Sequence, residues 1–253
     1  MGFSLVSAVG TRAEDGFSFA LFKHWAAHYL DLGFSPEHWK ISLYARDLDD
    51  NMGMVADWLM ERGIVPVHCI PDSPLFNPLE YDEEHHRIKA ALPPNEWIII
   101  ADADEFHGFP KPVSAFFDQL DVEGYDVVRG HFVDRVAADL SLPEVMDEPS
   151  IFEQFPLETR ITAKITEGLC EKACAFKNHL TTSVGHHHVY GEPRSYAPGL
   201  LKVHHFKWTK GLQGRAERHL SLKDKRYWWQ QECTRLLRYL KDDRMTFTFK
   251  QIT

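Results

Sequence analysis

Short apolar runs, separated by turn residues, predict strands along most of the chain. We expect strands at residues 3–9, 39–44, 64–70, 96–101, 125–133 and 201–206. The run Trp97–Ile100 contains no polar residue. A continuous apolar run of this kind is typical of a strand that is covered on both faces.

Between the strands, apolar residues recur with the three- and four-residue spacing of amphipathic helices. In the clearest case, at residues 16–32, Phe22, Trp25 and Tyr29 share one face, and Gly33 is a suitable end. Further helices are expected from the acidic turn at 47–51 to about residue 63, and at 82–92, 112–120, 211–222 and 227–240. The alternation predicts an α/β fold with a mostly parallel sheet and helices on both faces.

Residues 134–200 have no clear period and are rich in Pro, Glu and His. This composition is typical of an active-site lid or an acceptor-binding region. We therefore expect one α/β domain at residues 1–206, which includes this region, and a C-terminal helical extension at residues 207–253.

The net charge of −9 is unevenly distributed along the chain. Residues 201–253 carry 13 Lys+Arg against 5 Asp+Glu, a balance of +8, which leaves −17 on residues 1–200. The acidic body argues against nucleic acid as a partner. The basic region suits peripheral contact with an anionic membrane, although a solvated helical surface also explains most of its charges.

The location is predicted from three features of the sequence. The N-terminus has no basic leader, no run approaches the about 20 apolar residues of a membrane helix, and the four cysteines form no C-x-x-C pair. We expect a cytoplasmic protein in a reducing environment, with peripheral contact at the inner face of the membrane as a further hypothesis.

Three carboxylates follow the apolar run at residues 97–100, in Asp102-Ala103-Asp104-Glu105. Ligands of open α/β sheets bind beyond the carboxyl ends of strands, where this segment is expected to lie. Such closely spaced carboxylates repel one another unless a cation lies between them, and their hard oxygens suit Mn²⁺ or Mg²⁺. A metal shared with a diphosphate would neutralise charge on a leaving nucleotide.

Three segments resemble a known family. Glu96–Phe106 resembles the W-x-x-x-x-D-x-D-E-F signature of family-2-like bacterial glycosyltransferases, Phe22–Phe34 is similar to their W-x-x-x-H-x-x-x-G helix, and Val203–Trp208 resembles their H-Y-K-W segment. The resemblance implies a GT-A-like fold, a nucleotide-diphosphate sugar as donor, and a glycan or lipid-linked acceptor. It implies that Asp102 and Asp104 bind the metal and the donor phosphates.

The resemblance also suggests further site residues. A late histidine often completes the metal shell, which points to His205, with His204 as second choice. The family's Asn-Glu after the first strand is replaced by Ala13-Glu14-Asp15. Base or ribose contacts are therefore sought at Asp47 and Asp49, and a phosphate contact at Arg87.

An inverting sugar transfer needs a base for the acceptor hydroxyl. Asp134, Glu158 and Glu192 are the candidates, with a preference for Glu192 in its Gly-Glu-Pro turn, and each also suits a structural role. Lys172 and Lys177 are considered as phosphate partners or as ordinary surface lysines. The run His186–His188 is interpreted as a polar loop near the active site, because its spacing matches no standard zinc pattern.

The sequence thus predicts a metal-dependent glycosyltransferase that uses a nucleotide-diphosphate sugar, with inversion at the anomeric carbon. A sugar nucleotidyltransferase is an alternative, although Gly10-Thr11-Arg12 makes a poor triphosphate loop. A catalytically inactive relative that binds carbohydrate is the third possibility, and the intact pair Asp102 and Asp104 argues against it.

Overall fold

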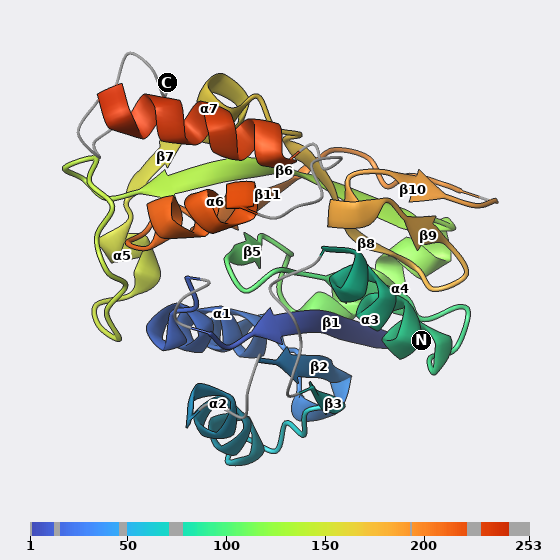
Figure 1. Ribbon diagram of the computed structural model, residues 1–253. Coiled ribbons are helices and arrows are strands. Elements are labelled where there is room, and N and C mark those ends of the chain that lie inside the picture. The colour runs from blue at the N-terminus through green and yellow to red at the C-terminus, as the bar shows by residue number, and fades with distance from the viewer. Residues whose placement is uncertain are drawn as a thin grey trace.

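A mixed β-sheet forms the centre of the protein (Figure 1). The computed structural model describes residues 2–12, 16–45, 50–70, 78–192, 194–221 and 229–242. Within these residues the strand order is β3-β2-β1-β4-β8-β6-β11-β5, and β7 pairs with β6. The strands are β1 (Phe3–Gly10), β2 (Trp39–Tyr44), β3 (His68–Ile70), β4 (Trp97–Ile100), β5 (Glu105–His107), β6 (Val127–Val136), β7 (Leu157–Thr159), β8 (Glu171–Lys177) and β11 (Leu201–His205). A hairpin of β9 (Thr181–Thr182) and β10 (Val189–Tyr190) forms a separate small sheet.

The strands of the N-terminal half of the sheet are parallel, and these are the strands that the sequence predicts most accurately. Strands β3, β2, β1 and β4 pair in parallel, with β1 between β2 and β4. The strand expected at 64–70 is shorter than predicted: the amide of Ile64 donates to the carbonyl of Leu59 and closes the end of the preceding helix. Side chains of β4 alternate between two cores, with Trp97 and Ile99 in one and Ile98 and Ile100 in the other. The prediction that this strand is covered on both faces is confirmed.

The prediction of an irregular segment at residues 134–200 was wrong in its middle. Strand β8 lies between β4 and β6 and pairs antiparallel with both. Its sequence Glu-Lys-Ala-Cys-Ala-Phe-Lys has no β-branched residue and carries charges near both ends, which hides it from a propensity argument. Yet the six residues Lys172–Lys177 are all buried.

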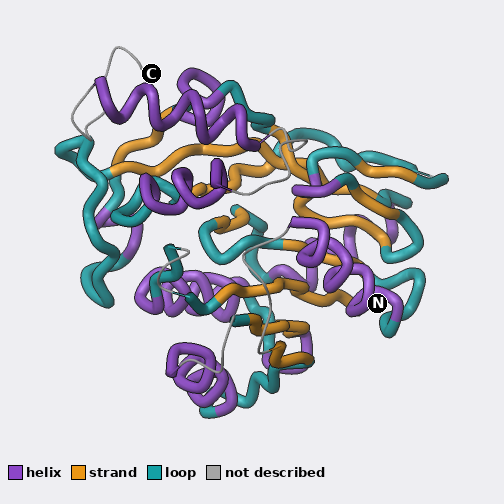
Figure 2. Tube along the Cα trace, in the orientation of Figure 1, coloured by secondary structure: helices purple, strands orange, loops and turns teal. Residues whose placement is uncertain are grey.

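Helices cover both faces of the sheet (Figures 1 and 2). The helices are α1 (Phe19–Leu32), α2 (Asp50–Met60), α3 (Pro78–Ala90), α4 (Val113–Glu123), α5 (Ile151–Gln154), α6 (Leu212–Ser221) and α7 (Trp229–Asp242), with short turns η2 (Pro36–His38), η3 (Thr162–Thr166) and η4 (Val184–His186). Helices α1, α2 and α4 contribute to one core, and Ile88 of α3 packs in the core on the opposite face. Helix α1 begins after Ser18, which accepts from the amide of Leu21, slightly later than the predicted start at residue 16. It ends at Gly33 with a φ of 101°, as the sequence predicts.

The two C-terminal helices pack against a second core beside the sheet. Leu212 of α6 and Leu236 and Leu240 of α7 are buried with Val136 and Trp208. The leucines of the last helix therefore form a packed stripe. Among the described helices, none is both long enough and apolar enough to cross a membrane.

Candidate active site

One pocket of about 350 Å³ lies beyond the carboxyl ends of β1 and β4. The ends of the parallel strands supply Ala8–Gly10 from β1, Tyr44 from β2 and Asp102 after β4. Since the chain leaves β1 toward β2 on one side and returns through β4 on the other, the strand order reverses here. Open α/β sheets bind their ligands at such a reversal point.

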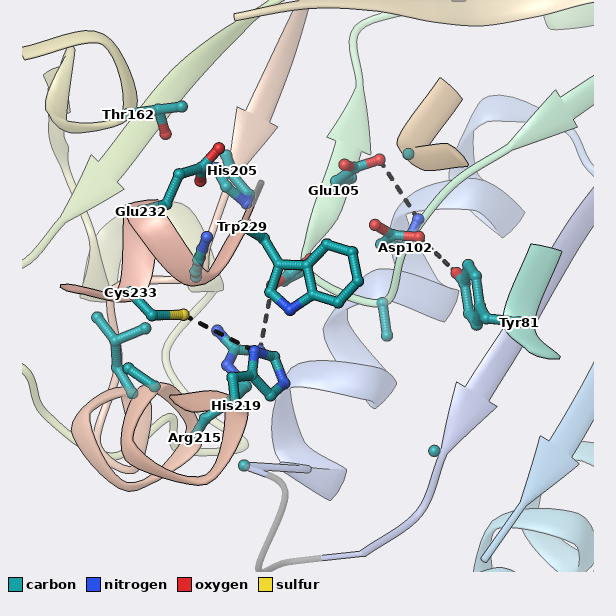
Figure 3. Close-up of a pocket in the computed structure, with 18 of the residues that line it drawn as sticks. Tyr81, Asp102, Glu105, Thr162, His205, Arg215, His219, Trp229, Glu232 and Cys233 are labelled. Carbon is teal, nitrogen blue, oxygen red and sulfur yellow. Dashed lines mark hydrogen bonds and ion pairs between the residues drawn. The ribbon is translucent and has the colours of Figure 1, made fainter. Parts of the chain in front are cut away.

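The opposite wall of the pocket comes from the C-terminal helices (Figure 3). Helix α6 provides Arg215 and His219, helix α7 provides Trp229 and Glu232, and Lys207 lies between β11 and α6. In Figure 3, Asp102 and Tyr81 lie on one side of the Trp229 indole, with Glu232 and His205 on the other. The wall facing the acidic strand end is thus rich in cationic and aromatic groups.

A lysine lies at the centre of the acidic strand end. The Nζ atom of Lys172 forms an ion pair with Glu105 and lies 3.7 Å from Oδ2 of Asp102. The prediction of an ordinary surface lysine was wrong for Lys172, which is only 1% exposed because β8 places it inside the sheet. Lys177 is also buried, in an ion pair with Asp121.

These contacts keep all three groups charged. Burial alone would raise the pKa of Asp102, but Lys172 and the hydrogen bond from the Tyr81 hydroxyl lower it well below its usual range. Burial likewise opposes ionisation of Glu105, and Lys172 lowers that pKa as well. Burial alone would lower the pKa of Lys172, but Asp102 and Glu105 raise it to about 12.

Asp104 takes a different position from its neighbours. Its Oδ2 lies 3.7 Å from Nη1 of Arg215, across the pocket wall, and its backbone carbonyl accepts from the amide of Phe206. All three carboxylates line the pocket, but Glu105 is turned inward to Lys172 and lies 3.8 Å from Nε2 of His107. The D-x-D carboxylates are therefore both within reach of a ligand.

His205 lies on the pocket side of the sheet and His204 on the other side. In β11, His205 is in register with Glu105 on one neighbour and Asp134 on the other, so the three side chains share a face. The His205 ring lines the pocket, stacked on Phe132. Nδ1 of His204 instead accepts from Nε of Arg135, 3.1 Å away.

The three base candidates from the sequence lie outside the pocket lining. Asp134 is buried and bonded to Thr162, His205 and Trp208. Glu158 pairs with Arg135 and Lys202 on the side of His204. Glu192 is 73% exposed and pairs with Arg194.

Glu232 is a pocket carboxylate that the sequence argument missed. It belongs to the first turn of α7, and its Oε1 lies so close to Gly168 that a Cβ added there would come within 2.9 Å. Burial raises its pKa, although Lys207, His205 and Arg235 act in the opposite direction. The sequence shows only that Glu232 lies in the first turn of a basic amphipathic helix. It does not show which cavity that helix borders.

The remaining residues that the sequence suggests for the site differ in where they lie. Arg87 forms an ion pair with Glu84 on α3 and does not line the pocket. Asp47 and Asp49, proposed for the base or ribose, lie outside the described residues, as does the loop at 13–15. In the histidine run, His187 lines the pocket and His186 is buried with its Nδ1 2.8 Å from the Thr182 hydroxyl.

The residues expected to hold a metal do not form a ready coordination shell. Asp102 is engaged by Tyr81 and Lys172, and Asp104 faces Arg215. Over the described ranges, no group of three or more His, Cys, Asp or Glu side chains is placed to hold a metal ion. A metal here would need phosphate oxygens among its ligands, and the predicted dependence on Mn²⁺ or Mg²⁺ stays a prediction.

Comparison with known proteins gives structural likenesses only. No protein-family model matches the chain, and no characterised protein sequence matches it. Staphylococcus aureus TarS is similar over 95% of this chain and 44% of its own, with 9% identity and a TM-score of 0.42. TarS residues 1–349 in complex with UDP-GlcNAc are similar over 94% of this chain and 73% of that chain, with 9% identity and a TM-score of 0.40.

A third likeness is partial. The apo-form glycosyltransferase GlyE of Streptococcus pneumoniae is similar over 51% of this chain and 29% of its own, with 15% identity and a TM-score of 0.30. The chain spans less than half the length of the longer TarS structure. At these scores the likenesses carry no functional conclusion, so the function rests on the chemistry of the pocket.

Proposed function

We propose that this protein is a glycosyltransferase that binds a nucleotide-diphosphate sugar in the pocket and transfers the sugar to an acceptor hydroxyl. The observation that carries the proposal is the position of Asp102 and Asp104, at the carboxyl end of β4 and at the reversal point of the sheet, opposite Arg215 and Lys207. The volume of about 350 Å³ suits a small-molecule ligand. The resemblance of the segment at 96–106 to family-2-like glycosyltransferases supports the same conclusion.

The cationic wall is suited to the donor diphosphate. Arg215 can engage two phosphate oxygens at once, and Lys207 adds a second positive charge. Both groups would stabilise the charge that develops on the nucleoside diphosphate as it leaves the anomeric carbon. Asp102, held by Tyr81, and Asp104 would then face the hydroxyls or phosphates of the donor.

Glu232 is the carboxylate we propose as general base. Of the carboxylates that line the pocket, Asp102, Asp104 and Glu105 belong to the acidic strand end, and Glu232 lies on the other wall. A carboxylate base suits direct displacement, in which the acceptor oxygen approaches the anomeric carbon from the side opposite the leaving group. Glu232 would take the hydroxyl proton as the new glycosidic bond forms, which gives inversion.

Thermal unfolding with a panel of nucleotides tests the donor proposal. UDP, GDP, CDP, ADP and dTDP, and the matching nucleotide sugars, would be compared with Mn²⁺ and with EDTA. One nucleoside diphosphate at about 100 times its dissociation constant should raise the melting temperature by about 5–10 °C. If none binds under either condition, and no nucleotide sugar does, the proposal is wrong.

An Arg215→Met variant gives the control for the site. It should fold and lose the response to the selected nucleotide, whereas Arg62→Met, on an exposed arginine near α2, should keep it. The acceptor and peripheral membrane contact through the basic C-terminal region remain predictions, as does a cytoplasmic location.

A further inference from the structure

Most of the charge of the acidic strand end is already offset within the chain. Asp102, Asp104 and Glu105 bring three carboxylates, and two basic side chains, Lys172 and Arg215, face them. Lys172 contacts two of the three, reaching Glu105 directly and Asp102 at 3.7 Å. Its ammonium therefore lies where the sequence argument required a cation between neighbouring carboxylates.

The position of this ammonium is fixed by the sheet. Lys172 is opposite Gly130 of β6 in the antiparallel ladder, and a Cβ at Gly130 would come within 2.4 Å of Cys174 Sγ. The absence of a side chain at 130 lets the strands pack closely beside Lys172. The lysine is 1% exposed and Glu105 is 3% exposed, so water cannot replace either partner.

We propose that Lys172 is the resident counter-cation of the acidic strand end, and that a divalent metal is not required to hold Asp102 and Glu105 in place. A lysine ammonium and a divalent ion compete for the same carboxylate oxygens. While Lys172 is in place, a metal bound to Asp102 is repelled by the ammonium, because Nζ of Lys172 lies 3.7 Å from Oδ2 of Asp102. One consequence rests on the proposed function. The nucleoside diphosphate should bind through Arg215 and Lys207 without a divalent metal, and therefore also in the presence of EDTA.

Removal of the lysine charge tests this in the absence of nucleotide. Lys172→Met should leave the buried Glu105 and the partly exposed Asp102 without their cation and lower the melting temperature in EDTA by about 10 °C. Millimolar Mn²⁺ should recover a large part of that loss, because the ion can enter between Asp102 and Glu105. The wild type should show no such stabilisation by Mn²⁺ alone.

Lys177→Met is the matched control. Lys177 lies on the same strand, is also buried, and forms an ion pair with Asp121. Its replacement should lower the melting temperature without any recovery by Mn²⁺, because Asp121 lies outside the pocket lining. A difference between the two lysines therefore reports on the acidic strand end and not on buried lysines in general.

A double variant keeps the proposal testable if Lys172→Met does not fold. Lys172→Met combined with Glu105→Gln removes one charge of each sign and should be more stable than the single variant, with little response to Mn²⁺. Two results would overturn the proposal: a single variant that is indifferent to Mn²⁺, or a double variant that is no more stable than the single one. Neither depends on nucleotide binding, so failure here is distinct from failure of the proposed function.

Discussion

The Nδ1 atom of His205 lies 3.0 Å from the Oδ1 atom of the buried Asp134 carboxylate. The Trp208 indole donates to the same oxygen, and Thr162 donates through both its amide and its hydroxyl. Burial alone would raise the pKa of Asp134, but the contacts with His205 and Thr162 lower it. A carboxylate with its oxygens occupied in this way orients the imidazole and leaves Nε2 to meet a ligand.

Replacement of Asp134 should destabilise the fold. Asp134→Ala removes the buried acceptor shared by Thr162 and Trp208 and should cost about 3 kcal/mol of unfolding free energy in urea denaturation. Asp57→Ala, on the exposed side of α2, should change that value by less than about 0.5 kcal/mol. Equal losses in the two variants would show that Asp134 is not a structural anchor.

His205 and His204 form a matched pair for mutation. His205→Ala removes the ring that lines the pocket and should lower turnover at least about tenfold, by analogy with the loss of other oriented histidines. His204→Ala removes a ring that packs against Phe152 on the other side of the sheet and should leave turnover close to wild type. Mn²⁺ binding, measured in parallel by titration calorimetry with nucleotide present, should fall further in His205→Ala if a metal joins the donor. The opposite ranking of the two variants would refute this placement.

Asp104→Asn tests the D-x-D assignment. The change keeps the size of the side chain and removes the charge that faces both the pocket and Arg215, so transfer should fall about 100-fold or more while the melting temperature moves by only a few degrees. Transfer would be measured as release of the nucleoside diphosphate, with Asp57→Asn as the surface control. Near-normal turnover in Mn²⁺ would show that the assignment is wrong.

Glu232→Gln separates chemistry from binding. Loss of the base should lower turnover by about 10²–10⁴-fold, whereas affinity for the nucleoside diphosphate should stay within about threefold. The exposed Glu217 on α6 gives the control Glu217→Gln, which should be active. A variant of Glu232 that transfers sugar at the normal rate would remove it from the mechanism.

The pH dependence of turnover follows from the same residue. Because burial raises the pKa of Glu232, the carboxyl is protonated over a wider pH range than a free glutamate, and turnover should fall as pH drops through that raised pKa. Stability moves the opposite way: a raised pKa in the folded state favours folding at low pH, and this contribution is lost as pH rises through the folded pKa. Glu232→Gln should therefore be at least as stable as wild type at pH 8 and should lack this acidic limb in its residual rate.

The sequence predicts the parallel half of the sheet because each element there has a local pattern. Trp97–Ile100 is apolar at every position, and Gly33 marks the end of α1. The same logic places Asp102 and Asp104 at the carboxyl end of a strand. These features depend on neighbours along the chain, so they can be inferred without coordinates.

The features that the sequence does not predict depend on residues that are distant along the chain. Lys172 is buried because Glu105 and Asp102 surround its ammonium, and nothing within several residues of it records that. Glu232 has the ordinary position of an acidic residue in the first turn of a helix, and only the packing of α7 against α6 and η3 brings it to the pocket. Residues whose role is set by charge balance across the sheet are therefore the ones that sequence patterns miss.

The central position of β8 has a consequence for the order in which the chain folds. Strand β4 emerges from the ribosome well before its neighbour β8, so its edge and the acidic turn after it wait unpaired while residues 101–170 are synthesised. Pairings between such distant segments form late and slowly. Docking of β8 delivers Lys172 to Glu105 and Asp102 in the same step that joins β4 to β6, so electrostatic attraction would help to guide β8 into its place between them.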